Sequence, residues 1–282
     1  MDHKGILALD IDNTLTDASH VVPQKVADTL ADMQARGWYV FVLTGRSFTF
    51  AMHALERFSF PYYLCTQNGA EGVTMPQKDP LFTHHIDKAQ LQAVMDITNP
   101  LGIECFIYSG YRLGDFCFYR KEGLSEELLD LAKIMQRFAS QPWQAFTSIE
   151  DIAATSFPLV KCIAPKPILE QARQALTQNP DFNLNILSDV FKMHLSVLLV
   201  THSTASKGQA LERVKNHLNT RLPVVAAGDD ENDISLLHRA DVKIAMGNGH
   251  PRLQEMADIV AKPSVEYGII EALQQAEAQL AH

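Results

Sequence analysis

The sequence predicts an α/β protein in which a doubly wound parallel sheet is interrupted by an inserted α+β segment. Two observations predict the sheet. Apolar runs of strand length alternate with helical stretches near the start of the chain, and the same alternation returns near its end. A third observation predicts the insertion, because the residues between these two regions form short strands and helices in a different order.

The first region reads strand, helix, strand, helix, strand. Pro23 suits a helix start and Gly37 a helix end. The strand runs are apolar without alternation, which is typical of parallel strands covered on both faces. The predicted elements are a strand over Ile6–Leu9, a helix over Lys25–Arg36, a strand over Tyr39–Leu43, a helix over Phe48–Phe58 and a strand over Tyr62–Thr66.

The pattern changes after a hairpin that we expect over Glu71–Phe82. The expected strands beyond it are Glu104–Tyr108, Phe116–Arg120, Leu159–Ala164, Asn183–Leu187 and Lys192–Leu199, and the expected helices are Lys88–Thr98, Ser125–Ala139 and Pro167–Gln178. This stretch is long enough to be a domain of its own. We therefore expect a domain of residues 84–199 inserted between residues 1–83 and 200–282, which form the sheet domain.

The doubly wound pattern resumes at Lys207. The expected elements are a helix over Lys207–Leu218, a strand over Leu222–Ala227, a helix over Ile234–Arg239, strands over Val242–Met246 and Asp258–Ala261, and a final helix from Tyr267. These elements complete the strand and helix alternation of a single sheet domain.

Composition excludes several functional classes. The chain has 24 basic and 33 acidic residues, for a formal charge of −9, so no basic surface argues for nucleic acid or an anionic membrane. No apolar run approaches membrane-spanning length, and no signal peptide precedes Asp10, so we expect a cytoplasmic protein. The four cysteines lack a CxxC spacing and predict buried free thiols: Cys65, Cys105, Cys117 and Cys162.

Polar residues follow the predicted strands of the sheet domain, at the edge where ligands bind in open α/β sheets. They are Asp10 and Asp12, then Thr44, Gly45 and Arg46, then Asn68, then Asp229, Asn232 and Asp233, with Lys207 at a helix start. Two unit charges 4 Å apart repel by about 4 kcal/mol at an effective dielectric of 20, so clustered carboxylates call for a cation. Each residue alone has a structural explanation as a helix cap or turn former, but their occurrence at one edge favours a shared site.

This set of residues fits phosphoryl transfer through an aspartyl-phosphate. Asp10 is the expected nucleophile, and Asp12 the acid and base, a role that favours a raised pKa. Thr44 and Lys207 are expected to hold the phosphoryl oxygens. Mg²⁺ suits the oxygen ligands, which we expect to be Asp10, the backbone carbonyl of Asp12, Asp229 and, directly or through water, Asp233.

The order DxDxT, TGR, Lys and GDxxND resembles the haloacid dehalogenase-like superfamily of phosphohydrolases. The long insertion and Thr66-Gln67-Asn68-Gly69-Ala70 resemble its Cof-type members of subfamily IIB. The resemblance implies a Rossmann-like core, an inserted α+β cap (type C2B), Mg²⁺, and a small phosphorylated metabolite such as a sugar phosphate as substrate. It matches Asp10, Asp12, Thr44, Lys207 and Asp229 to the catalytic set. Gly45, Arg46, Asn68 and Asn232 are then the expected substrate-binding residues, and we expect a monomer or a homodimer.

Asn13 departs from the family, which usually has Gly there, but Asn tolerates the positive φ that the turn needs. The candidates for reading the organic part of the substrate are His84, His85, Tyr108, Arg112, Arg120, His194 and His202.

Two alternatives use similar residues. A phosphomutase uses the same aspartate pair but returns the phosphoryl group to its substrate, so the products distinguish it. A phosphorylatable receiver module also places Asp, Mg²⁺ and Lys at strand ends, but receivers are far shorter and lack the second acid. A DxD glycosyltransferase does not explain Lys207 or GDxxND, and no P-loop motif occurs.

Overall fold

The computed structural model describes residues 3–17, 19–120, 124–188 and 195–280. The chain divides into two compact units. Unit 1 comprises residues 1–46, 51–82 and 206–282, and unit 2 comprises residues 47–50 and 83–205. Most of unit 2, residues 83–205, is thus a single insertion between residues 82 and 206 of unit 1.

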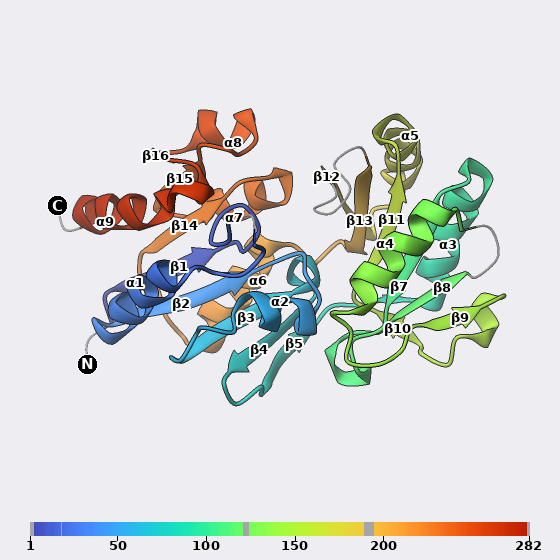
Figure 1. Cartoon of the computed structure of the whole chain (residues 1–282), viewed down its shortest axis with the longest axis horizontal. Helices are drawn as coiled ribbons and strands as arrows, with labels where there is room; N and C mark the ends of the chain where they lie inside the picture. Colours follow the sequence, from blue (N-terminus) through green and yellow to red (C-terminus); the bar gives the residue numbers. More distant parts are fainter. Residues whose placement is uncertain (1–2, 18, 121–123, 189–194, 281–282) are drawn as a thin grey trace. The chain divides into compact units, whose positions relative to one another are not determined.

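Unit 1 is built on an eight-stranded sheet with the order β16-β15-β14-β1-β2-β3-β4-β5 (Figure 1). Strand β1 lies between β14 and β2 and is parallel to both, whereas β4 runs antiparallel to β3. The strands are β1 (Gly5–Leu9), β2 (Trp38–Leu43), β3 (Tyr62–Thr66), β4 (Glu71–Met75), β5 (Pro80–Thr83), β14 (Val224–Gly228), β15 (Val242–Met246) and β16 (Ile259–Ala261).

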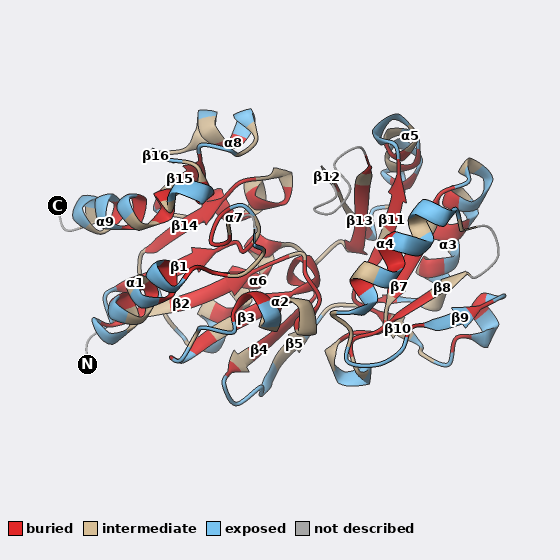
Figure 2. Ribbon diagram, viewed as in Figure 1, coloured by how far each residue is buried: buried red, intermediate tan, exposed pale blue. Residues whose placement is uncertain are grey.

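Both faces of this sheet are buried. Ile6 and Ala8 of β1 pack with Leu211 and Val214 of α6, while Leu7 and its neighbours on the other face are equally inaccessible to solvent (Figure 2). Helices α1 and α9 contact each other, as do α6 and α7. The helices are α1 (Gln24–Ala35), α2 (Phe48–Ala54), α6 (Lys207–His217), α7 (Ile234–Leu237), α8 (Pro251–Met256) and α9 (Gly268–Leu280). Burial on both faces explains why the central strands are apolar throughout.

Unit 2 has a six-stranded sheet with the order β12-β13-β11-β7-β8-β9 and a separate pair, β10-β6. The sheet is antiparallel except for β8 and β9. Its strands are β6 (Ile86–Asp87), β7 (Glu104–Tyr108), β8 (Cys117–Arg120), β9 (Gln144–Phe146), β10 (Ser156–Phe157), β11 (Val160–Ala164), β12 (Phe182–Ser188) and β13 (Ser196–His202), and its helices are α3 (Lys88–Thr98), α4 (Glu126–Gln136) and α5 (Lys166–Leu176). Sheet and helices share one apolar core.

The predicted doubly wound parallel sheet with an inserted α+β segment is confirmed, and several element boundaries differ from the prediction. Strand β13 runs on to His202, which pairs with Phe182, so a boundary at residue 200 would cut it, and unit 2 ends at Ala205. The strand expected over Lys192–Leu199 is seen over Ser196–His202, and residues 189–194 lie outside the described residues. The helix expected over Phe48–Phe58 ends at Ala54.

Residues 47–50 belong to unit 2 because of the contacts they make there. The ring of Phe50 lies 4.4 Å from that of Phe138, and the Thr49 N–H donates to the Asp115 carboxylate at 2.6 Å. These contacts join residues far apart in the sequence, so the pattern of the chain did not indicate them. Within the described residues, no helix combines the length and the apolar character needed to cross a membrane.

Candidate active site

The site begins where β1 ends. Asp10 directly follows the strand, and its backbone N–H donates to the Ala227 carbonyl of β14 at 3.1 Å. The neighbouring strand β14 ends one residue before Asp229. Because β1 and β14 are parallel and paired, both aspartates stand at the same carboxyl edge of the sheet.

Lys207 joins this edge from the first position of α6. Its Nζ donates to Asp10 Oδ1 at 2.5 Å and to Asp233 Oδ1 at 2.6 Å. The Lys207 side chain is 1% exposed, and that of Asp233 is fully buried. A cation at a helix N-terminus opposes the helix dipole, so the two carboxylates supply the attraction that keeps it there.

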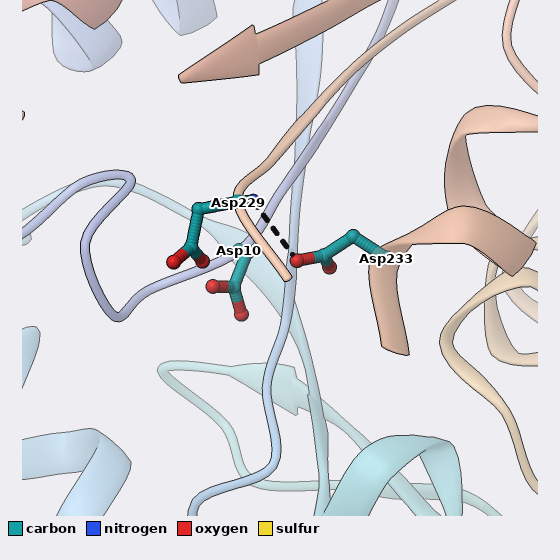
Figure 3. A group of neighbouring side chains, drawn as sticks. All are labelled: Asp10, Asp229 and Asp233. Atoms are coloured by element: carbon teal, nitrogen blue, oxygen red, sulfur yellow. Dashed lines mark hydrogen bonds between the residues drawn. The ribbon is translucent and has the colours of Figure 1, made fainter. Parts of the chain in front are cut away.

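Asp233 is fixed by the loop that follows β14. Its Oδ2 accepts the backbone N–H of Asp229 at 3.1 Å (Figure 3). The same oxygen accepts the backbone N–H of Asp230 at 3.2 Å. Gly228 makes this close approach possible, since a Cβ at this position would lie 2.4 Å from the Asp233 Cγ. Both oxygens of Asp233 therefore already accept hydrogen bonds from the protein.

Burial and charge together shift the pKa values in this cluster. Burial raises the pKa of Asp10 to about 7, with Lys207 opposing the shift and the charges of Asp233 and Asp12 adding to it. Burial and the charge of Asp10 raise the pKa of Asp229 well above its usual range. Burial alone would lower the pKa of Lys207, but the two carboxylates outweigh it and raise that pKa.

The cluster has the composition of a divalent cation site. Oxygen atoms from Asp10, Asp229 and Asp233 all lie within 4.8 Å of one another (Figure 3). Lys207 pairs with Asp10 and Asp233 and carries one positive charge, so three ionised carboxylates would leave this buried group with an excess of negative charge. An all-oxygen donor set with uncompensated negative charge suits a hard divalent cation. The residues present thus fit a metal.

Asp12 points to a different partner from the other aspartates. Arg46 donates to it twice, from Nε to Oδ2 at 2.9 Å and from Nη2 to Oδ1 at 2.6 Å. Burial would raise the pKa of Asp12, but the charge and hydrogen bonds of Arg46 outweigh it and lower that pKa. The raised pKa expected from crowding by like charges is therefore wrong for this arrangement. The guanidinium, which we had expected to bind substrate, here holds the carboxylate ionised.

Asn13 is a residue of the site that the sequence did not assign to it. Its side-chain Nδ2 donates to Asp229 Oδ2 at 3.2 Å, and its φ of 52° is the left-handed conformation expected for this turn. The Asn248 side chain in turn donates to the Asn13 carbonyl at 3.0 Å. The one available signal was the Asn where the family usually has Gly, because a glycine has no side chain to reach Asp229.

The other predicted residues lie at the ends of β2, β3 and β14. Thr44 is fully buried, and its Oγ1 accepts the Arg46 N–H at 3.0 Å, across Gly45. Asn232 Nδ2 donates to Asn68 Oδ1 at 3.2 Å, which joins the loops after β14 and β3. Hydrogen bonds and ion pairs thus join the predicted residues into the Lys207 group, the Asp12–Arg46 pair and the Asn68–Asn232 pair.

Gly69, beside Asn68, brings the loop after β3 against the start of α6. Its φ is +88°, and a Cβ there would lie 2.4 Å from the Ser206 carbonyl oxygen. This contact lies one residue before Lys207. The TQNGA segment therefore helps to fix the helix end that carries the lysine.

The candidates for reading the substrate's organic part belong to unit 2. Thr204 Oγ1 lies 2.9 Å from His84 Nδ1 and 2.8 Å from His202 Nδ1. His85 instead meets Ser156, as expected if adjacent histidines point in different directions. Arg120 lies 3.9 Å from Glu104, Tyr108 is partly buried and Arg112 is exposed. His194 lies outside the described residues.

Known proteins resemble this chain over nearly its whole length. Residues 7–273 match the family of haloacid dehalogenase-like hydrolases. Phosphatase YwpJ of Bacillus subtilis is 29% identical over 94% of this chain and 96% of its own. The 5-amino-6-(5-phospho-D-ribitylamino)uracil phosphatase YcsE of the same organism is 22% identical over 95% of this chain and 94% of its own.

Solved structures agree in fold. A haloacid dehalogenase-like hydrolase from B. subtilis superposes with a TM-score of 0.80 at 23% identity, over 96% of this chain and 99% of that one. A sugar phosphatase of subclass IIB superposes with a TM-score of 0.76 at 20% identity, over 96% of this chain and 98% of that one. The chain therefore belongs to the haloacid dehalogenase-like hydrolases.

Proposed function

We propose that the protein is a Mg²⁺-dependent phosphatase that hydrolyses a small phosphate monoester through a phosphorylated Asp10. The observation that carries this proposal is the buried contact of Asp10 with Lys207 at 2.5 Å, beside Asp229 and Asp233. An ammonium on one carboxylate oxygen leaves the other oxygen as the nucleophile. The same ammonium is in place to balance charge on the phosphoryl group.

In the first step, an Asp10 oxygen bonds to phosphorus and the bond from phosphorus to the ester oxygen breaks. The leaving alkoxide takes a proton from Asp12. In the second step, Asp12 takes a proton from water as the water oxygen bonds to the phosphorus of phospho-Asp10. The bond from phosphorus to the Asp10 oxygen breaks, which releases inorganic phosphate and restores the Asp10 carboxylate. Thr44, Gly45, Asn68 and Asn232 are assigned to binding the substrate beside these groups.

Contact with Arg46 determines whether Asp12 is protonated, as the acid of the first step must be, or ionised, as the base of the second step must be. Paired with Arg46, Asp12 is ionised and suited to accept a proton from water. For the first step it must carry a proton, so its contact with Arg46 has to loosen when substrate is bound. A phosphoryl oxygen near Arg46 would compete with Asp12 for the guanidinium, in keeping with the substrate-binding role assigned to Arg46.

The metal would be held by Asp10, Asp229 and the backbone carbonyl of Asp12. Asp233 would act through water, because both of its carboxylate oxygens accept hydrogen bonds from the protein. A bound Mg²⁺ would supply positive charge that polarises the phosphoryl group and reduces repulsion between it and Asp10.

The substrate class rests on the relatives. One is named for a phosphorylated ribityl compound, and one solved structure is titled a sugar phosphatase. Polyhydroxylated phosphate esters are common to both, so we propose a sugar phosphate or a similar metabolite.

A phosphate-release screen tests the proposal. Purified protein is incubated with Mg²⁺ and sugar phosphates, nucleotides, cofactor phosphates and phosphoglycerate derivatives in turn, and inorganic phosphate is measured. Release from at least one ester, abolished by EDTA and restored by Mg²⁺, is the expected result. Conversion of a sugar phosphate to an isomer without release would identify a phosphomutase, and activity undiminished by EDTA would remove the metal from the scheme.

Mg²⁺ should stabilise the protein less at pH 6 than at pH 8. Because the pKa of Asp10 is raised to about 7, the folded metal-free protein binds more protons than the unfolded chain between about pH 4 and pH 7. Its stability therefore falls as the pH rises through this range, and Mg²⁺ must displace protons to bind below pH 7. Below pH 7, we expect the apparent Mg²⁺ affinity to fall by about tenfold for each unit by which the pH is lowered, for every proton that the metal displaces. Melting curves with and without Mg²⁺ at both pH values measure this, and an equal Mg²⁺ effect at both would contradict it.

Asn13→Gly should weaken Mg²⁺ binding without changing the fold. Glycine adopts the φ of 52° freely, so the substitution removes only the hydrogen bond to Asp229. Loss of a hydrogen bond to a metal ligand typically costs about tenfold in metal affinity. Mg²⁺ titration calorimetry on the metal-free protein should show this loss of affinity, and kcat should be nearly restored at saturating Mg²⁺.

Asn219→Gly is the matched control, because Asn219 is exposed and has a φ of 48°. This variant should bind Mg²⁺ as the wild type does. Unchanged affinity in Asn13→Gly would show that the Asn13 contact has no role in the metal site.

A further inference from the structure

The central strands of unit 2 bring two cysteines face to face. Cys105 of β7 and Cys162 of β11 are directly opposite each other in an antiparallel pair. Their sulfur atoms lie 3.1 Å apart, closer than two sulfurs in ordinary van der Waals contact. Both cysteines are in unit 2, and neither is assigned a part in the catalytic scheme.

The register of the two strands favours a bond between these sulfurs. The Tyr108 N–H donates to the Leu159 carbonyl at 3.0 Å, which makes these opposed residues a hydrogen-bonded pair. Hydrogen-bonded and non-hydrogen-bonded pairs of opposed residues alternate along an antiparallel ladder. Cys105 and Cys162 are opposed three positions along from Tyr108 and Leu159, so they form a non-hydrogen-bonded pair. In such pairs the Cα atoms are about 4.5 Å apart, within the range that a disulfide spans.

Hydrogen bonds around the sulfurs assign them different roles. The Thr98 hydroxyl donates to the Val94 carbonyl at 3.0 Å, so its oxygen is free to accept from the Cys105 thiol at 3.5 Å. The Cys105 sulfur then accepts from the thiol of Cys162. This hydrogen bond lowers the pKa of Cys105, while the same contact raises that of Cys162 well above its usual range. Cys105, which is 8% exposed, is therefore the more readily ionised of the two, and Cys162 is fully buried.

We propose that Cys105 and Cys162 form a reversible intramolecular disulfide when the protein meets a hydroperoxide. The Cys105 thiolate attacks the peroxide oxygen, the O–O bond breaks, and Cys105 becomes a sulfenic acid. The Cys162 sulfur then bonds to the Cys105 sulfur, the S–O bond breaks, and water leaves with the Cys162 proton. For hydrogen peroxide, two thiols and one peroxide give one disulfide and two waters.

The other two cysteines provide the contrast. Burial raises the pKa of Cys65 to about 12, and burial with the charge of Asp115 raises that of Cys117 well above its usual range. Cys117 lies on β8, opposite Tyr108 rather than another cysteine. All four cysteines are buried and free, as the sequence predicted, so the pairing distinguishes Cys105 and Cys162 from the rest.

Thiol counting on the full-length protein tests the proposal. After treatment with hydrogen peroxide, the protein is unfolded and alkylated, and its intact mass gives the number of modified cysteines. The reduced wild type carries four thiols, and the treated protein should carry two, with four restored by dithiothreitol. Proteolysis and mass spectrometry should then recover one linked peptide pair containing residues 105 and 162.

Single variants decide which cysteines are involved. Cys117→Ala should lose two thiols, from three to one, as the wild type loses two from four. Cys105→Ala should keep all three, and Cys162→Ala, which lacks the second thiol, should carry a sulfenic acid at Cys105 and no link. Linking the strands closes a long loop, so the oxidised wild type should melt about 5 °C higher than the reduced protein. Retention of four thiols, sulfinic acid at Cys105 without a link, links between chains, or a lower melting temperature on oxidation would each overturn the proposal.

Discussion

Asp10→Asn is expected to abolish phosphate release while leaving the protein folded. An amide in place of the carboxylate cannot form the phosphorylated intermediate, and removing a catalytic nucleophile commonly costs at least about 10⁴-fold in kcat. Lys207 keeps its contact with Asp233 in this variant, so a buried ammonium is not left alone. Phosphate release at saturating substrate and Mg²⁺ is the measurement.

The same variant should not lose stability. The pKa of Asp10 is raised to about 7, which means that the folded protein disfavours the ionised carboxylate relative to the neutral form. A neutral Asn removes this penalty, so metal-free Asp10→Asn should melt no lower than the metal-free wild type at pH 8. Asp32→Asn, at an exposed carboxylate paired with Arg36, is the matched control and should keep full activity. Wild-type activity in Asp10→Asn would end the proposal of a phospho-Asp10 intermediate.

The fold was predictable where burial of a strand produces an uninterrupted run of apolar residues in the sequence. Strands β2, β3 and β15 coincide with the apolar runs to within one residue, because parallel strands covered on both faces are apolar at most positions. Strand β9 was missed, since it has three residues, two of them exposed, and so carries no recognisable pattern. Helix α8 was missed as well, because its six residues bury only Leu253.

For the site, sequence order predicted which residues stand at the sheet edge but not how they pair. Strand ends are local features, so Asp10 and Asp229 could be placed from their own surroundings. The contact of Arg46 with Asp12 joins residues 34 apart, and that of Asn13 with Asp229 joins residues 216 apart. Such pairings depend on side-chain packing in three dimensions. For this reason the predicted direction of the Asp12 pKa shift was wrong. The charged group that contacts Asp12 is the Arg46 guanidinium, which lowers the pKa.

Asp12→Asn should trap the enzyme between its two chemical steps. With an aryl phosphate, whose leaving group departs without a proton, loss of the acid should barely slow the first step. The second step still needs a base to activate water, so it should slow by about 10²–10⁴-fold. We expect a burst of phenol close to one equivalent per protein, and an intact mass increased by one phosphoryl group. Asp10→Asn combined with Asp12→Asn should show neither.

The choice of ester separates the two roles of Asp12. An alkyl phosphate such as a sugar phosphate needs the acid in its first step, so kcat/KM for it should fall by about 10²–10⁴-fold while that for the aryl ester stays near the wild-type value. Equal losses in kcat/KM with both esters would mean that Asp12 does not protonate the leaving group. Steady turnover of the aryl ester without a burst would mean that it is not the base either. Since Arg46 already holds Asp12 ionised, the base role is the one that the observed contacts favour in the absence of substrate, and the burst tests it directly.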